Sequence, residues 1–249
     1  MLRPTGVRGH GCGAGQPPQV RRFEILVEAC QQRGAVPIRR DVDFKPKQTD
    51  RTWSWCKYDR QIDDLPLPFG QTGVQLQNAA CVVAAIEHLQ SQLAVSDKAL
   101  RSGLRQASLA GRAQVIAEAP YVVVDVAHNQ DSVRSLRDFI ERNLPEGRVI
   151  VVCGMLKDKE IGVSLSEIQP LVDQWHLATI NVERGATADA LELELQATAK
   201  TALNEVSLWN DVQAAYDHVM QTASEDDCVV IFGSFYVVAD ILAHHQRSP

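Results

Sequence analysis

From about residue 113 to the end of the chain, short apolar runs alternate with segments of helical spacing, and this alternation most constrains the fold. Residues 122–124 are consecutive valines, as in a strand that is buried on both faces of a sheet. After Asn129 the apolar residues recur at helical spacing, at Val133, Leu136 and Ile140. The pattern predicts strands over 113–118, 121–126, 148–153, 175–180, 205–208 and 227–232, and helices over 130–142, 159–168, 187–198, 210–222 and 235–245. We therefore expect an α/β domain with a Rossmann-like, mostly parallel sheet.

The chain before residue 109 has a different pattern. Residues 1–22 are rich in glycine and proline, contain no acidic residue and show no periodicity, so we expect them to be disordered or non-native. The rest predicts helices over 23–33, 75–93 and 97–107, strands over 35–44 and 53–55, and an extended link over 64–68. We place the domain boundary near residue 110, which divides the chain into segments 1–22, 23–108 and 109–249.

Charge and apolar content narrow the possible partners and compartments. The 249 residues include 25 basic and 31 acidic ones, a net charge of -6, with no long block of either sign, so we expect no nucleic-acid partner. The longest apolar run covers residues 79–86, too short to cross a bilayer, so we expect a soluble, cytoplasmic protein. The six cysteines form no CxxC pair and lie near no histidine at ligand spacing. We expect reduced, mostly buried thiols and no metal site formed by them.

Polar and glycine residues gather where the predicted strands end. Asp125, His128 and Asn129 follow one strand, and similar loops lie over 110–114, 154–159, 184–187 and 233–235. Ligands of open α/β sheets bind outside the carboxyl ends of the strands, so these loops together indicate a binding edge. Each loop also has a simpler explanation. Asn129, Thr187 or Ser234 can cap a helix, Asp125 can merely end a strand, and lysines are often only solvated.

Six motifs in order carry a resemblance to a known family. They are LQNAA at 76–80, AGRAQ at 110–114, DVAHN at 125–129, GMLKDKE at 154–160, RGAT at 184–187 and GSF at 233–235. In these motifs the chain resembles the bifunctional dihydrofolate synthase/folylpolyglutamate synthases of the Mur ligase superfamily, over residues 23–242. The resemblance implies that residues 23–108 are part of a central ATPase domain and that 109–249 are a glutamate-ligase domain.

The resemblance also implies a reaction and its ligands. ATP phosphorylates the carboxylate of dihydropteroate, or the γ-carboxylate of a folate, and L-glutamate attacks the acyl phosphate, with ATP and Mg²⁺ required. By this resemblance the catalytic residues are Arg112 and His128. ATP is contacted by Asn78 at adenine, by Arg112 at the phosphates, by Asp125 at the ribose and by His128. The residues near the incoming glutamate are Lys159, Ser234 and Phe235. The family further implies a monomer in the full-length form. Burial of Asn78 within an apolar helix would favour a functional role, because an unpartnered amide is costly to bury.

Departures from the family pattern leave rival functions open. The family usually has PGRFQ, NP and SFHT where this chain has Ala113 in AGRAQ, Gln130 after Asn129, and Tyr236 after Phe235. No G-x-x-x-x-G-K-[ST] phosphate loop occurs in the sequence. The resemblance implies that the magnesium ligands of the family are missing with it. We therefore expect a fragment that is inactive alone. The alternatives are a non-catalytic nucleotide- or folate-binding module and another Mur-type amide ligase.

Overall fold

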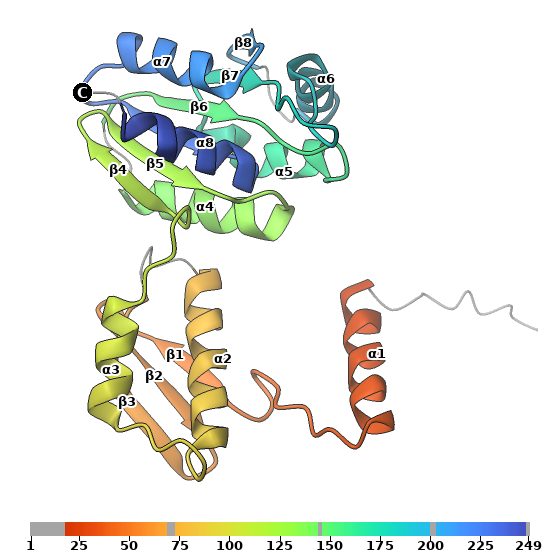
Figure 1. The fold of residues 1–249 in the computed structure, drawn as a ribbon, viewed down its shortest axis with the longest axis vertical. Helices are drawn as coiled ribbons and strands as arrows, with labels where there is room; N and C mark the ends of the chain where they lie inside the picture. The colour runs from red at the N-terminus through yellow and green to blue at the C-terminus, as the bar shows by residue number, and fades with distance from the viewer. Residues whose placement is uncertain (1–17, 69–72, 144–145, 200–202, 248–249) are drawn as a thin grey trace, which may run out of the picture.

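The computed structural model describes residues 18–68, 73–143, 146–199 and 203–247 (Figure 1). In these residues the chain forms two sheets. The smaller one is antiparallel, in the order β1 (Lys45–Gln48), β2 (Thr52–Lys57) and β3 (Arg60–Pro66). The larger one has the order β4 (Gln114–Glu118), β5 (Tyr121–Asp125), β9 (Cys228–Phe232), β6 (Val149–Cys153), β7 (Gln174–Ala178) and β8 (Glu205–Trp209). All pairs in the larger sheet are parallel except β4 with β5. The expected α/β architecture is confirmed.

Helices cover both faces of the larger sheet. The core on one face contains Val123 together with residues of α4 (Gln130–Asn143), α5 (Ile161–Ile168) and α6 (Ala188–Thr198). The core on the other face contains Val122 and Val124 with residues of α7 (Val212–Thr222) and α8 (Phe235–His245). All three valines are fully buried, as the uninterrupted β-branched run predicts. A short 3-10 helix, Gln169–Leu171, follows α5.

The smaller sheet forms a separate core with α2 (Gly73–Leu89) and α3 (Asp97–Gln106). Trp53 and Trp55 of β2 are the largest side chains in it, and both are buried. Ser96 caps α3, because its side chain accepts a hydrogen bond from the Ala99 amide. Helix α1 (Pro18–Gln32) stands apart from both sheets in Figure 1, with Ile25 and Leu26 exposed.

Three sequence predictions before residue 109 are wrong. Residues 18–22, which we expected to be disordered or non-native, form the start of α1, while residues 1–17 lie outside the described part of the chain. Residues 35–44 do not form a strand, because the Arg39 amide donates to the Asp43 carboxylate at 2.7 Å and Asp41 adopts a φ of 65°, which turns the chain before β1 begins. The expected extended link over 64–68 is in part strand, since β3 continues to Pro66. Pro66 is tolerated there because it ends the strand at the edge of the sheet.

Helix length and thiol burial bear on two further expectations. No helix within the described ranges is long and apolar enough to span a bilayer. Of the five cysteines in the described part of the chain, all free, only Cys153 and Cys228 are buried, so the expectation of mostly buried thiols is wrong. Cys81 is exposed because its position on α2 faces away from the small core.

Candidate functional site

Three neighbouring strands of the larger sheet end at the same level. Asp125 of β5 is in register with Phe232 of β9, which in turn is in register with Cys153 of β6. The loops that hold His128, Lys159 and Ser234 follow these three strand ends, so their expected position along one edge is confirmed. After β5 the chain enters α4 on one face, and after β9 it enters α8 on the other. Such a switch point opens a crevice in doubly wound sheets.

Asp125 is buried at this switch point and is hydrogen-bonded by the backbone. Only 7% of the residue is exposed. One carboxylate oxygen accepts from the Ala113 amide and the other from the Ala127 amide, each at 2.7 Å. Burial raises the pKa of Asp125 to about 6, against the opposing effect of the two amides and of the positive charge at Arg112 and His128. The carboxylate therefore sits within a positively polarised pocket that only partly offsets its desolvation.

Arg112, His128 and Phe235 form a cluster beside Asp125. The Arg112 guanidinium carbon lies 5.8 Å from the centre of the Phe235 ring, a cation–π arrangement, and the His128 ring centre lies 6.4 Å from the same ring. The Nδ1 of His128 lies 2.7 Å from the Val126 carbonyl. Because a carbonyl only accepts, this nitrogen carries the proton. Phe235 is 60% exposed, so the cluster presents a flat ring and a cation to solvent.

A groove of about 320 Å³ lies between α2 and α3 and contains residues from both halves of the chain. Its walls are mainly apolar, and its polar groups come from Gln75, Asn78, Ser108 and Arg112. Asn78 is exposed on α2, so the expectation that its amide is buried is wrong. Helix α2 packs Ala79, Ala80 and Val83 into the core of the small sheet, and Asn78 therefore faces the groove. The groove nonetheless brings Asn78 and Arg112, both expected to contact ATP, to one cavity.

The residues expected near glutamate lie in two environments. The Lys159 ammonium is 3.5 Å from Asp158, whose carboxylate also accepts from Arg184 at 2.7 Å. The Arg184 hydrogen bond lowers the pKa of Asp158. Ser234 is 3% exposed, and its hydroxyl accepts from the Val237 amide at 3.1 Å.

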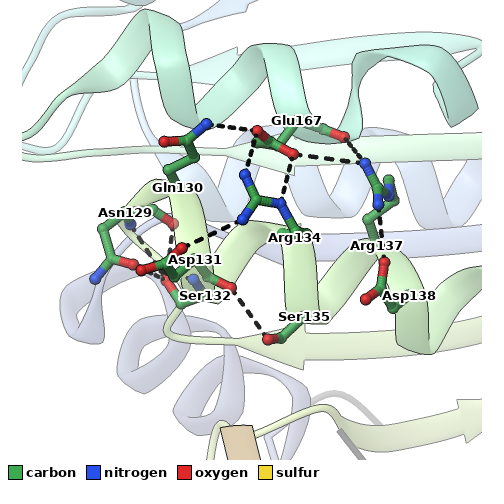
Figure 2. Close-up of polar contacts among 9 residues, drawn as sticks. All are labelled: Asn129, Gln130, Asp131, Ser132, Arg134, Ser135, Arg137, Asp138 and Glu167. Atoms are coloured by element: carbon green, nitrogen blue, oxygen red, sulfur yellow. Dashed lines mark hydrogen bonds and ion pairs between the residues drawn. The ribbon is translucent and has the colours of Figure 1, made fainter. Parts of the chain in front are cut away.

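The capping explanations are correct for three of these loops. Ser234 caps α8, Thr187 caps α6, and the Asn129 side chain accepts from the Ser132 amide at the start of α4. Figure 2 shows this cap and, beyond it, the buried carboxylate of Glu167, which ties α5 to α4. Capping holds the loops in place and does not exclude ligand contacts by their neighbours.

Two features of the site were not predicted. Gln114 accepts a hydrogen bond from the Gly111 amide at 2.9 Å, and Ala113 adopts a φ of 41°. Gly233 has a φ of 123°, and a Cβ there would lie 2.3 Å from the Gly154 carbonyl oxygen, so glycine alone allows these two loops to approach. The motifs AGRAQ and GSF include these positions, but sequence spacing does not reveal a positive φ at an alanine or a contact between separate loops.

The fold and site together define a class of protein. A mostly parallel sheet with cationic and aromatic groups at its switch point is typical of α/β domains that hold nucleotides or anionic substrates. The family described as "Mur ligase, glutamate ligase domain" matches residues 111–235, half of the chain. The chain belongs to this Mur ligase family.

Relatives and solved structures agree with that assignment. The dihydrofolate synthase/folylpolyglutamate synthase of Escherichia coli K12 is 35% identical over 217 residues, which cover 87% of this chain and 48% of the relative. The enzyme of the same name from Haemophilus influenzae is 31% identical over 239 residues, 88% of this chain and 53% of the relative. The chain thus spans about half the length of these relatives.

The solved structures match across both halves of the chain. A structure of E. coli FolC in complex with DHPP and ADP has a TM-score of 0.78 and 33% identity, over 90% of this chain and 51% of that one. A bifunctional folylpolyglutamate synthase/dihydrofolate synthase with Mn, AMPPNP and L-glutamate bound also has a TM-score of 0.78, with 34% identity over the same shares.

Proposed function

We propose that this chain takes part in ATP-dependent ligation of L-glutamate to dihydropteroate and to the γ-carboxylate of folates, through an acyl phosphate. The observation that carries the proposal is the Arg112 guanidinium, held over Phe235 beside His128 and Asp125 and reaching the groove that also holds Asn78. The relatives are named for these two synthase activities, and the titles of the similar structures name DHPP, ADP and L-glutamate.

The nucleotide roles follow from charge and shape. Asn78 offers an amide to adenine at the groove wall, and Arg112 offers a permanent positive charge to the phosphates. Charge accumulates on the transferred phosphoryl group, so a cation that reaches it stabilises the transition state. We propose that His128 lines the nucleotide site, since its ring lies near Phe235 and Arg112. Each carboxylate oxygen of Asp125 accepts a hydrogen bond from one backbone amide and has a second lone pair free for another donor. We propose that a ribose hydroxyl donates to one of these lone pairs at the exposed edge of the carboxylate.

The glutamate subsite is proposed around Lys159, Ser234 and Phe235. The Lys159 side chain is 29% exposed, and among the described residues its ammonium pairs with one carboxylate, that of Asp158 at 3.5 Å, so it has charge available for a substrate carboxylate. Ser234 lies at the N-terminus of α8, where the helix dipole favours an anion. The Phe235 ring, which is 60% exposed, offers an apolar surface on one side of this subsite.

Binding of the metal and formation of a phosphate loop require residues other than those assigned above to the nucleotide and to glutamate. The family uses Mg²⁺, which supplies positive charge to the phosphates and is held by oxygen ligands. Among the described residues no three His, Cys, Asp or Glu side chains come together as a metal site, and the sequence contains no G-x-x-x-x-G-K-[ST] loop. We propose that the 249 residues supply adenine, ribose and glutamate contacts and do not complete a turnover by themselves.

A binding assay beside a turnover assay tests this function. Isothermal titration of the purified chain with ADP is expected to show weak binding, and ATP with dihydropteroate and L-glutamate is expected to give no ADP release. Glutamate-dependent ADP release that Asp125→Ala abolishes would contradict the proposal that the chain is inactive alone. Absence of any ADP binding would contradict the nucleotide site.

A non-catalytic nucleotide- or folate-binding module is the second candidate, favoured by the missing phosphate loop. The discriminating test mixes this chain with a separately produced polypeptide that contains the phosphate-loop half of the E. coli relative. Restored glutamate ligation supports a ligase half. Continued ADP binding without any turnover in the mixture supports a binding module.

A further inference from the structure

Asp125 has a second role that ligand contacts do not require. We propose that Asp125 is a positioning residue that fixes the loop of residues 111–114, and with it Arg112, to the C-terminal sheet. The pivot between the two halves of the chain then lies in residues 107–110, and Gly111 is part of the rigid C-terminal body. The argument starts from the contacts of this loop.

Three hydrogen bonds fix the 111–114 loop, two to the end of β5 and one within the loop. The Asp125 carboxylate accepts from the Ala113 amide at 2.7 Å, and the Val126 amide donates to the Gly111 carbonyl at 2.9 Å. Within the loop, the Gly111 amide donates to the Gln114 side chain at 2.9 Å. The residues on either side of Arg112 are therefore both bonded to the end of β5.

Packing adds to these bonds. Ala113 is 2% exposed, and it belongs to the core beneath α4 and α5. A Cβ on Gly111 would lie 2.6 Å from a methyl group of Val238 on α8, so the glycine is pressed against that helix. Gly111 has a φ of 69° and Ala113 a φ of 41°, a backbone shape that an L residue such as alanine adopts only when its surroundings hold it. Here the buried carboxylate of Asp125 provides that hold.

Residues 107–110 have the opposite character. All four are exposed, and none belongs to a helix or strand. Among the described residues, the one backbone hydrogen bond that these four make outside helices and strands is donated by the Ala107 amide to the Gly103 carbonyl. This bond closes the C-terminal end of α3. Rotation at residues 107–110 moves the halves with little loss of packing, whereas rotation at Gly111 breaks contacts with β5 and α8. Arg112 thus travels with the sheet and keeps its place over Phe235.

We call the attachment of the 111–114 loop to Asp125 the latch. Limited trypsin digestion of the full chain tests it, because Arg112–Ala113 and Arg105–Gln106 are trypsin sites on either side of the proposed pivot. Mass spectrometry follows the initial rate of each cleavage. In the wild type, cleavage after Arg105 is expected to precede cleavage after Arg112. In Asp125→Asn, which puts an amide group against one of the two backbone donors, cleavage after Arg112 is expected to rise by about tenfold or more.

Asp227→Asn is the matched control. Asp227 is also buried and accepts from two backbone amides, those of Arg148 and Ser224, but at the opposite end of the same sheet. It is expected to lower the melting temperature without selectively increasing cleavage after Arg112. Gln114→Ala, a milder change in the loop itself, is expected to give an intermediate increase. Equal cleavage at both sites in the wild type, or the same response in Asp227→Asn as in Asp125→Asn, would overturn the latch.

A double-mutant cycle on ADP affinity separates positioning from direct contact, and this arm rests on the proposed nucleotide site. Because Asp125 is also proposed to contact the ribose, a positioning role through Arg112 is expected to make the double variant Asp125→Asn with Arg112→Ala lose less affinity than the sum of the two single losses. Losses that add fully would leave Asp125 with the ribose contact alone and overturn the positioning role. Absence of ADP binding to the wild type removes the proposed function, while the digestion still decides the latch.

Discussion

Arg112 owes its place to its neighbours more than to its own contacts. Its guanidinium lies over Phe235, while the amide of the next residue is bonded to Asp125. Lys157, in contrast, extends from the β6–α5 loop with its ammonium 3.3 Å from the Glu183 carbonyl. Both residues are cationic and lie at the same edge of the large sheet, Arg112 just before β4 and Lys157 after β6, so they form a natural pair for comparison.

We expect Arg112→Ala to weaken ADP binding by about tenfold or more, because a charge-assisted contact to phosphate is lost. Lys157→Ala is expected to change it by less than about twofold, since that ammonium is solvated. Isothermal titration at fixed salt measures both. Equal, small effects would remove Arg112 from the phosphate site.

Buried His176 predicts a dependence of stability on pH. Burial, together with the charge of nearby His218, lowers its pKa to about 4, and its Nδ1 accepts from the Trp209 indole at 3.1 Å. The unfolded histidine binds its proton near pH 6.5, so between about pH 6.5 and 4 the unfolded state holds more protons than the folded one. As the pH is lowered from about 6.5 to 4, the free energy of unfolding is therefore expected to decrease by about 2 kcal/mol because of this group.

Denaturant titrations at pH 7 and pH 5 measure the change, with His176→Gln as the variant. The variant should lose much of this pH dependence. Asp125 acts in the opposite direction, because its raised pKa of about 6 makes the folded state hold more protons between about pH 4 and 6. Asp125→Asn is therefore expected to steepen the acid loss of stability. A variant slope identical to that of the wild type in both cases would refute these assignments.

At the scale of elements, one carboxylate joins α4 to α5. Figure 2 shows Glu167 of α5 facing three side chains of α4. It accepts from Gln130 at 2.7 Å and from Arg134 at 2.9 Å, with Arg137 at 3.5 Å. The Glu167 side chain is 11% exposed, and hydrogen bonds from Arg134 lower its pKa. Such a group, unlike a typical surface ion pair, leaves several donors without an acceptor when it is removed.

We expect Glu167→Ala to lower the free energy of unfolding by about 2 kcal/mol. Glu141→Ala is the matched control, since Glu141 lies on the same helix pair but contacts only Arg137, at 3.7 Å, and its side chain is 49% exposed. The control is expected to cost less than about 0.5 kcal/mol. Chemical denaturation monitored by circular dichroism compares them. A Glu167 variant as stable as the control would show that apolar packing alone holds α4 to α5.

At the scale of the whole molecule, the described residues form separate cores. The cluster around Trp53 and Trp55 contains residues only from 44–104, and the two clusters on the larger sheet contain residues only from 113–241. The exposed residues 107–110 join them. We propose on this basis that the boundary lies between 108 and 109.

We expect residues 109–249 to fold when produced alone, with a melting temperature within about 5 °C of the matching transition in the full chain, because no core residue of the large sheet is removed. Residues 119–249 are the control. They lack β4, and so expose the edge of β5 and delete the Ala113 amide that Asp125 binds. The shorter piece is expected to be markedly less stable. A molten 109–249 would place the boundary elsewhere.

Local sequence pattern predicted most of the large sheet correctly, because its strands are apolar on both faces and its helices have one apolar stripe. It also predicted the edge at which Asp125, His128, Lys159 and Ser234 lie, since parallel strands must end on the same side. It failed at residues 35–44, where a side chain from Asp43 closes a turn, and at Asn78, whose exposure depends on how α2 rotates against the small core.

The sequence by itself thus determined the α/β class, the order of elements along the chain and the chemistry available at the strand ends. Only the tertiary structure decided that β9 enters between β5 and β6, which places Phe235 against Arg112. It also decided that Gly111 is fixed to the sheet. The physical reason is that strand order and the contacts of a buried carboxylate depend on residues far apart in the chain, which short-range periodicity does not encode.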